Sequence, residues 1–333
     1  MAASDDCRAF PEDLTKEILV RLPVKSLFRF KCACKKWYAL IKSHSFIQQH
    51  LNCSKNKLLI YDYGAPDDDE SPPISLTILD DQNEENNPQR FRGMTNLIGS
   101  MDGLFYLECE IDRELISCAL WNPATTEVRA IPLPPPKIDG STYYGGGREF
   151  GFGLDPLTND YKVVHFYTLY FDTAVYSCSR DSWRIFRPKN FYKSFLSERK
   201  DVTRRTYGTL YLNGAYYWLL TGKWNILSFD FGSEVFEEIG GPDVHSVNSR
   251  VYGLILLDDS IAVLNTSCYD SSLILVTRAS RLVSYNVRMK KTMHLGFRHL
   301  GLRRVPECGG CGVHCYKESL VTIKRREVAD IFD

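Results

Sequence analysis

The stretch CALWNPATTEVRAI, residues 118–131, carries the pattern that decides the fold of most of this chain. A short apolar run ends in Trp121-Asn122, a polar turn follows, and apolar side chains resume at Val128 and Ile131. Short apolar runs broken by Gly, Pro, Asn and Asp are typical of β-strands. The stretch therefore predicts two strands joined by a turn.

The same pattern recurs along the chain at a nearly constant spacing. Further copies lie at Tyr176-Ser177 with Trp183, at Phe229-Asp230 with Phe236, and at Tyr285-Asn286 with Met293. Taken at positions 122, 177, 230 and 286, the copies are 55, 53 and 56 residues apart. A repeat of about 50 residues is typical of a β-propeller close to the kelch type, because one blade cannot bury both of its faces alone. The alternative is an irregular β-sandwich with chance spacing.

The surrounding sequence supports a mainly β protein. From about residue 100 onward no long helical period appears. Before it, residues 64–90 are acidic and rich in Pro and Asn around one apolar patch, Ile74 to Leu79. We expect a strand at this patch between two solvated loops.

The first fifty residues predict short helices instead. Pro11 followed by two acidic residues favours a helix start, and an apolar stripe then recurs at i, i+4 and i+8 before Pro23 ends the helix. Further helices are expected around Leu27 with Phe30, around Cys34, Trp37 and Ile41, and after Ser45, which could cap the fourth. So small a module buries little core alone, and its apolar excess predicts a surface that a partner completes.

Charge and cysteine content exclude several classes of protein. Lys+Arg and Asp+Glu both number 41, so the net charge is zero and nothing global favours nucleic acid or membrane binding. The apolar runs are far shorter than the roughly 20 residues that a membrane-spanning helix needs. The N-terminus MAASDDCRAF lacks the apolar stretch of a secretory signal. The 11 cysteines are therefore expected to be reduced thiols in the cytoplasm or the nucleus.

Motifs for catalysis or cofactor binding are missing from the sequence. It holds no G-x-S-x-G, P-loop, G-x-G-x-x-G or H-E-x-x-H, so we expect no intrinsic catalysis and no cofactor. Four soft ligands crowd into Cys308, Cys311, His314 and Cys315, but neighbouring ligands rarely point at one metal. We therefore expect a Gly-rich turn that leads into a strand, and no metal. The basic region 271–306 holds eight Lys/Arg and no acid, and its alternation with apolar residues favours the solvated face of strands over nucleic acid binding.

The helical head resembles the F-box, over roughly residues 9–50. The resemblance rests on FPEDL at 10–14, EIL at 17–19, RLPVKSL at 21–27, RFKC at 29–32, CKKW at 34–37, LI at 40–41 and SF at 45–46. It implies docking onto a Skp-type adaptor, which links to cullin and RING subunits. The residues expected to form this docking module are Pro11, Leu14, Ile18, Leu19, Leu22, Pro23, Leu27 and Trp37. We expect about half of them to face the adaptor, the others to form the core of the module, and Trp37 to be internal.

The remainder resembles the plant F-box-associated domain. The motifs that carry this resemblance are WNPATTEVRAIP at 121–132, FGFGLDPLTNDYKVV at 150–164, VYSCSRDSWR at 175–184, YLNGAYYWL at 211–219 and ILSFDFGSEVFEEI at 226–239. Within that family the chain looks most like the S-locus F-box group of pollen. One departure lies between Asp258 and Ile274, where about one repeat is missing and an incomplete propeller is expected.

Together the resemblances imply an adaptor with an F-box at residues 8–50 and a β domain at residues 55–326. Its expected function is substrate recognition in an SCF-type (Skp–cullin–F-box) ubiquitin ligase, with a protein substrate that the sequence does not name. For an S-locus protein the substrate would be a basic pistil ribonuclease, which the acidic residues 67–70 could attract. The alternatives are a propeller enzyme, a non-degradative scaffold and a decaying receptor copy. A fragment that starts near Ser54 is expected to keep any substrate binding but to lose ubiquitination in a reconstituted ligase.

Overall fold

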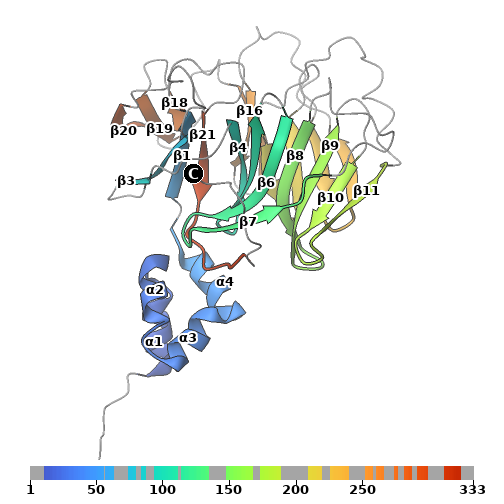
Figure 1. The fold of residues 1–333 in the computed structure, drawn as a ribbon. Helices are drawn as coiled ribbons and strands as arrows, with labels where there is room; N and C mark the ends of the chain where they lie inside the picture. The colour runs from blue at the N-terminus through green and yellow to red at the C-terminus, as the bar shows by residue number, and fades with distance from the viewer. Residues whose placement is uncertain are drawn as a thin grey trace, which may run out of the picture.

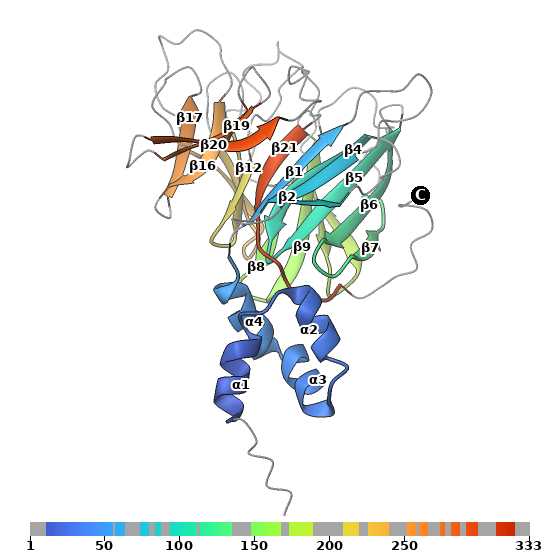
Figure 2. The same ribbon diagram turned by 90° about the vertical axis from the view of Figure 1, so that its left-hand side faces the viewer.

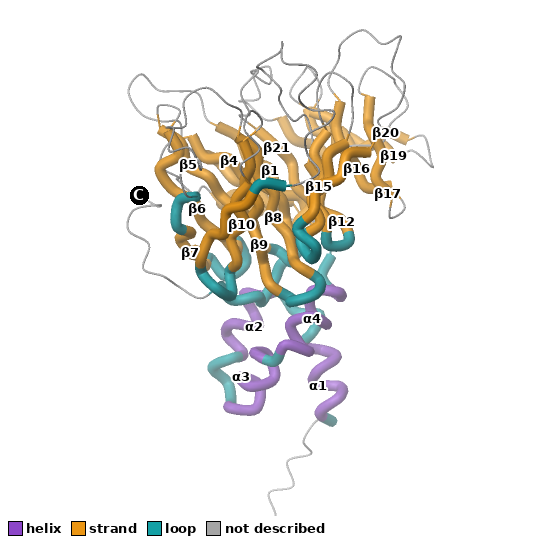
Figure 3. The backbone as a smooth tube through the Cα atoms, turned by 90° about the vertical axis from the view of Figure 1, so that its right-hand side faces the viewer, coloured by secondary structure: helices purple, strands orange, loops and turns teal. Residues whose placement is uncertain are grey.

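In the residues that a computed structural model describes, four short helices are followed by antiparallel β-sheets (Figure 1). The helices form a module at one end, and Figure 3 shows described loops, in teal, between this module and the strands. The structure describes residues 11–55, 57–63, 74–79, 84–87, 94–111, 114–134, 148–167, 173–188, 209–219, 226–239, 252–257, 260–265, 274–276, 281–286, 291–298 and 311–323.

The four predicted helices are present as α1 (Glu12–Leu19), α2 (Val24–Phe30), α3 (Lys35–Lys42) and α4 (His44–Cys53). Pro11 and Pro23 each stand directly before a helix, where a proline needs no amide hydrogen. The cap of α4 is Ser43 and not the expected Ser45, because Ser43 Oγ accepts a hydrogen bond from the Phe46 amide at 3.3 Å. The helix therefore begins at His44, one residue before Ser45.

The helices enclose a small apolar core of their own. Its buried side chains from the helices and their connections are Leu19, Val20, Val24, Leu27, Ile41 and Phe46. A seventh member, Leu320, comes from the opposite end of the described chain. The helical module is therefore not closed by its own residues alone.

Four sheets of the β domain have four strands each. Sheet A has the order β21 (Cys311–Tyr316), β1 (Lys57–Tyr63), β2 (Ile74–Leu79) and β3 (Glu84–Asn87). Sheet B has β4 (Met94–Met101), β5 (Leu104–Ile111), β6 (Glu114–Asn122) and β7 (Glu127–Ile131). Sheet C has β8 (Arg148–Asp155), β9 (Asp160–Tyr167), β10 (Thr173–Ser177) and β11 (Ser182–Phe186). Sheet D has β12 (Thr209–Leu212), β13 (Ala215–Leu219), β14 (Ile226–Asp230) and β15 (Val235–Ile239).

Sheet A joins the two ends of the β domain. Its first strand in space, β21, is the last described strand of the chain and lies beside β1 (Figure 2). The two strands pair so that His314 lies opposite Leu59. The strand predicted at residues 74–79 is β2. Strand β3 lies in the acidic stretch that was expected to be a loop, and it pairs with β2. Strand β3 was not predicted because its residues, EENN, have little preference for strands.

The predicted repeat corresponds to one turn that sheets B, C and D share. Asn122, Ser177 and Asp230 end the third strand of their sheets, and a four-residue loop leads from each into the fourth strand. The last residue of each loop has a left-handed backbone, with φ of 56° at Thr126, 55° at Asp181 and 57° at Glu234. The period of the sequence thus marks one turn per sheet, as a propeller blade requires.

The repeat weakens in the last part of the domain. Sheet E pairs β16 (Tyr252–Leu257) with β17 (Ser260–Asn265), and sheet F holds β18 (Ile274–Val276), β19 (Arg281–Asn286) and β20 (Lys291–Arg298). Asn286 ends β19 and Lys291 begins β20, which repeats the four-residue spacing. Within the described ranges these sheets have only two and three strands, at the place where a segment was expected to be missing.

Among the described residues, three apolar clusters lie between neighbouring sheets and hold them face to face. The cluster between sheets A and B is built around Phe105, Trp121 and Tyr316. A second, between sheets B and C, includes Tyr106, Phe152 and Tyr176. The third, between sheets C and D, consists of Val164, Phe166, Val175, Tyr216, Trp218, Leu227, Phe229, Phe231 and Phe236. Many of the aromatic side chains of the sequence therefore pack between neighbouring sheets.

Candidate functional site

Helix α1 presents two bare apolar side chains to solvent. Leu14 is 47% exposed and Ile18 is 51% exposed, although both are large aliphatic residues. They are four residues apart on one helix, so they lie on the same face, one turn from each other. Their helical neighbours Leu19 and Val20 are buried in the core of the module. The two exposed residues therefore form an apolar strip with a folded core behind it.

The eight residues expected to form the docking module divide evenly between surface and interior. Pro11, Leu14, Ile18 and Pro23 are exposed. The other four lie inside the module: Leu19 and Leu27 are buried, and Leu22 and Trp37 are half-buried and packed against the core. The Trp37 ring meets Phe30 edge-on, with 5.3 Å between ring centroids. This division says which residues are available to a partner, and contact with an adaptor remains a prediction.

Two exposed aromatic residues of the module were not among those predicted. They are Phe28 on α2 and Tyr38 on α3. Lys31 Nζ lies 4.1 Å from the centre of the Phe28 ring. Lys42 Nζ lies 4.6 Å from the centre of the Tyr38 ring and donates a hydrogen bond of 2.6 Å to Tyr38 Oη. Each ring is thus shielded by a cation, whereas no such contact covers Leu14 or Ile18. A lysine three or four residues after an exposed aromatic was the signal available in the sequence.

The surface of α2 and α3 is strongly basic. Between residues 24 and 42 the chain holds six Lys or Arg and no acidic residue. Five of these cations are exposed, namely Lys25, Arg29, Lys35, Lys36 and Lys42. Charge complementarity speeds association and fixes orientation, so this surface favours an acidic partner.

A buried histidine holds the corner between α1 and α2. The Nε2 of His50, on α4, lies 2.9 Å from the carbonyl oxygen of Leu22, and the His50 ring stacks on Phe46. Burial lowers the pKa of His50, although the Leu22 carbonyl and the nearby Glu318 carboxylate act in the opposite direction. The imidazole is therefore neutral near pH 7, with Nε2–H as the donor to Leu22. This bond orients the helix that carries the apolar strip.

The opposite end of the β domain is the other candidate surface. The short described turns at 123–126 and 178–181 lie toward the helices (Figure 1). Along the sequence, residues 135–147 separate sheet B from sheet C and residues 189–208 separate sheet C from sheet D, and both ranges lie outside the described residues. Long connections between strands are where binding specificity usually resides.

Three sequence features can be placed only in part. Cys311, His314 and Cys315 belong to strand β21, while Cys308 lies outside the described residues. No group of three His, Cys, Asp or Glu side chains arranged to hold a metal occurs in the part of the chain that the structure describes. The acidic residues 67–70 are also outside the described ranges. None of the described helices is long and apolar enough to cross a membrane.

Both parts of the chain match known protein families. Residues 9–49 match the F-box domain, and residues 67–323 match the F-box associated beta propeller domain. F-box protein At3g10430 of Arabidopsis thaliana is 32% identical over 243 residues, which make up 69% of this chain and 61% of that protein. F-box/WD-40 repeat-containing protein 1 of the same species is 29% identical over 270 residues, 73% of this chain and 59% of that protein. The chain thus spans about three fifths of the length of these relatives.

Likeness to solved structures is more distant. A chain of the nidogen/laminin complex aligns over 72% of this chain and 92% of its own length, with 14% identity and a TM-score of 0.37. A score this low supports no further conclusion. The match to the F-box associated beta propeller domain, in contrast, covers more than half of the sequence and includes the repeated turns of sheets B, C and D. The protein therefore belongs to the F-box proteins that carry an F-box-associated β-propeller domain.

Proposed function

We propose that this protein is the substrate-recognition subunit of an SCF-type ubiquitin ligase, and that it works without a catalytic group of its own. The observation that carries the proposal is the apolar strip of Leu14 and Ile18 on a helix whose other face is fully packed. An F-box helix that leaves such a strip bare needs a partner to cover it. The partner we propose is a Skp-type adaptor, with cullin and RING subunits beyond it, in the cytoplasm or the nucleus.

The mechanism is proximity. Ubiquitin transfer would take place on the RING side of the assembly, and this protein would hold a substrate close to the charged conjugating enzyme. Tethering raises the effective concentration of substrate lysines at the reaction centre without any new chemistry. The division into an F-box at 8–50 and a β domain at 55–326 is part of this proposal.

The substrate is proposed to be a protein that binds the end of the β domain away from the helices. Specificity there would come from loops between strands, where binding specificity usually resides. The narrower expectation, a pollen S-locus protein that recognises basic ribonucleases, rests on resemblance and on the acidic residues 67–70. The relatives described above lend it no support, so our proposal leaves the substrate unnamed.

The test is an apolar-to-charged substitution on the strip, Leu14→Asp with Ile18→Asp. Both side chains are exposed, so the module should stay folded, while two carboxylates at the docking surface would lose their hydration on binding. We expect co-purification with a Skp-type adaptor to be lost. Leu22→Asp is a poorer test, because Leu22 packs against the core of the module and its replacement would unfold the module itself.

Leu157→Asp is the matched control. Leu157 is 78% exposed in the turn between β8 and β9, so the same chemical change is made on the β domain instead of on α1. Adaptor binding should remain at the wild-type level in this variant. Equal binding by the α1 double variant and the control would show that the docking assignment is wrong.

The competing functions predict other results. A propeller enzyme would turn over a substrate as isolated protein, in the absence of any ligase subunit. A non-degradative scaffold would bind the adaptor through α1, but substrate abundance would not change when the α1 strip is mutated. Proximity labelling in the native tissue, with the proteasome inhibited, would supply the substrate for that comparison.

A further inference from the structure

We propose that residues 317–323, the clamp segment, lock the F-box helices to the β domain in one orientation and so position bound substrate relative to the adaptor. This inference deepens the proposed function and rests on it only where ubiquitin transfer is concerned. The clamp segment follows β21 directly and runs between the helical module and sheets A and B. It contacts both parts through separate side chains.

Glu318 supplies a helix cap that α2 lacks locally. Pro23 precedes α2 and its side chain makes no capping hydrogen bond. The Oε2 of Glu318 instead accepts a hydrogen bond from the Val24 amide at 3.0 Å, at the positive end of the helix dipole. The other oxygen, Oε1, accepts from Lys57 Nζ at 2.6 Å. One carboxylate therefore joins the start of α2 to the start of β1.

Leu320 completes the core of the helical module. It is 1% exposed and belongs to the same cluster as Leu19, Leu27 and Phe46. Ser54, which follows α4, adds a polar contact, because its Oγ lies 3.4 Å from the Glu318 carbonyl oxygen. On the side that faces the helices, the clamp segment therefore supplies a side chain that the core of the helical module does not obtain from the helices themselves.

The other face of the clamp segment is fixed to sheet B. Asn122 Nδ2 donates to the carbonyl oxygens of Ser319 at 3.1 Å and Val321 at 2.8 Å. Glu127 Oε2 accepts from the Ile323 amide at 2.8 Å, and the Ile323 side chain enters the core between sheets B and C. These bonds come from the two ends of the β6–β7 turn.

Close packing reinforces this attachment at the neighbouring turn. Gly103, between β4 and β5, has a φ of +76°, and a Cβ there would lie 2.5 Å from both the Lys317 carbonyl oxygen and Ser319 Cβ. Only glycine lets the turn approach the clamp segment this closely. The segment is thus held by backbone, side chain and packing on its β-domain face.

A rigid joint follows from these contacts. Leu320 is anchored in the helices and Ile323 in the sheets, and the two residues between these anchors leave little room for a hinge. The distance from the α1 strip to the far end of the propeller would then be constant, and with it the set of substrate lysines within reach. A fragment starting near Ser54, expected to keep substrate binding, would lack the helices that cover Leu320, so the clamp predicts that its β domain is less stable than in the full chain.

The test is the spread of distances between the two parts in the full chain. Spin labels are attached through non-natural amino acids at Lys35 on α3 and Arg180 in the β10–β11 turn, both exposed, and pulsed EPR reports the distance distribution. We expect one narrow distribution for the wild type. Leu320→Ala should broaden it, and amide exchange at Val24 and Leu27 should accelerate by about 30-fold or more, as the loss of a buried leucine side chain implies.

Two further variants keep the test decisive. Thr322→Ala changes an exposed residue of the same segment and should leave the distribution narrow. Glu318→Gln keeps the volume of the side chain but removes the charge that faces Lys57 and the α2 terminus, so it should broaden the distribution even if Leu320→Ala fails to fold. An unchanged width in both Glu318→Gln and a folded Leu320→Ala protein would overturn the clamp.

The readout is independent of the ligase. The distance distribution does not require the adaptor, so failure of adaptor binding would leave the clamp standing. Conversely, a clamp that proves loose would not affect the assignment of Leu14 and Ile18. In a reconstituted ligase, the clamp further predicts that Glu318→Gln spreads ubiquitin over more substrate lysines while adaptor affinity stays unchanged.

Discussion

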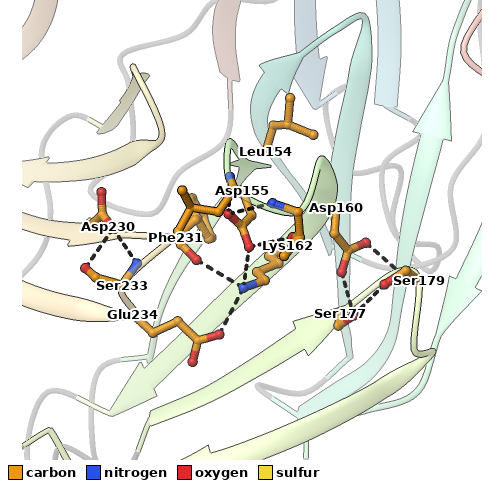
Figure 4. A network of polar contacts seen from close by, with 12 residues as sticks. Leu154, Asp155, Asp160, Lys162, Ser177, Ser179, Asp230, Phe231, Ser233 and Glu234 are labelled. Carbon is orange, nitrogen blue, oxygen red and sulfur yellow. Dashed lines mark hydrogen bonds and ion pairs between the residues drawn. The ribbon is translucent and has the colours of Figure 1, made fainter. Parts of the chain in front are cut away.

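Lys162 Nζ, on β9 of sheet C, lies 3.0 Å from Glu234 Oε1, in the β14–β15 turn of sheet D (Figure 4). The same ammonium donates to the Phe231 carbonyl oxygen at 3.0 Å and pairs with Asp155 Oδ2 at 2.8 Å. Sheet B reaches sheet C in the same manner, because Arg129 Nη2 donates to Asp181 Oδ1 at 3.1 Å. Each cation thus contacts an acidic residue with a left-handed backbone in a turn of the following sheet. These contacts link sheet B to sheet C and sheet C to sheet D.

Lys162→Met should destabilise the β domain by about 3–5 kcal/mol, because it removes one partner of a buried ionic network. Asp155 is almost fully buried. Burial alone would raise the pKa of this carboxyl, but hydrogen bonds from Lys162 and Thr158 outweigh it and lower the pKa. In this variant Glu234 keeps its ion pair with Arg184, whereas the buried Asp155 carboxylate loses its ion pair with Lys162. Most of the destabilisation should therefore come from Asp155. Urea unfolding of the full chain measures the change.

The control for this prediction is Arg21→Met. Arg21, which follows the end of α1, pairs with Glu17 of that helix, but both side chains are more than 60% exposed. An exposed pair contributes only about 0–1 kcal/mol. Similar losses in the two variants would contradict the claim that the Lys162 network holds sheets C and D together.

Gly151→Ala should cost about 1–3 kcal/mol, because the new methyl group overpacks the junction of sheets C and D. A Cβ at this position of β8 would lie 2.7 Å from Tyr216 Cδ1 and 2.8 Å from Trp218 Cζ2. Trp218 cannot withdraw freely, since its Nε1 donates to the Phe150 carbonyl oxygen at 2.9 Å. Thermal unfolding of the variant should begin earlier than in the wild type.

Gly232→Ala provides the comparison for Gly151. The nearest atoms to a Cβ there belong to Leu157, at 3.1 Å, and that exposed side chain can move aside. We expect the stability of this variant to change by less than about 0.5 kcal/mol. Equal destabilisation at both positions would mean that backbone flexibility and not packing decides the effect.

The stability of the F-box helices should fall as the pH drops below about 6.5, the ordinary pKa of histidine. His50 is buried and its pKa is lowered, chiefly by loss of hydration. On acidification the unfolded chain takes up a proton first, so the stabilisation is complete above the unfolded pKa and is lost as the pH falls toward the folded pKa. Amide exchange in α4 between pH 7.5 and 5.0 would record the loss.

His50→Gln isolates this contribution from the other histidines. Glutamine can still donate to the Leu22 carbonyl but does not titrate in this range. The variant should therefore show a flatter dependence of α4 exchange on pH, after correction for intrinsic rates. A dependence as steep as that of the wild type would assign the effect to other groups.

Sheets E and F should exchange amide hydrogens more than about tenfold faster than sheets C and D. In the described residues, sheet E is a pair of strands, β16 and β17, and an isolated pair is marginally stable. The comparison is internal, because β13 and β14 of sheet D serve as the protected reference. Equal protection in β16–β17 and β13–β14 would indicate that the ring closes despite the shortened repeat.

The sequence by itself determined the elements whose causes are local. The four-residue turns were visible because Asn122, Ser177 and Asp230 each hydrogen-bond to backbone amides within their own turns, at Ala124, Arg180 and Ser233. Such bonds depend on residues two or three positions apart. The helices of the F-box were equally predictable from the apolar stripe and the prolines. Strand β3 was missed because its stability comes from its partner β2.

Only the tertiary structure decided which half of the apolar stripe is bare. Leu14, Ile18, Leu19 and Leu22 are alike in sequence, yet Leu19 is buried and Ile18 is half exposed, because the other helices cover one face of α1. The contacts between the F-box helices and the β domain could not be predicted from the sequence either. Glu318 caps Val24 and Leu320 fills the F-box core from nearly the whole length of the chain away. Contacts so distant follow no periodicity, since they arise when sheet A brings the two ends of the β domain together.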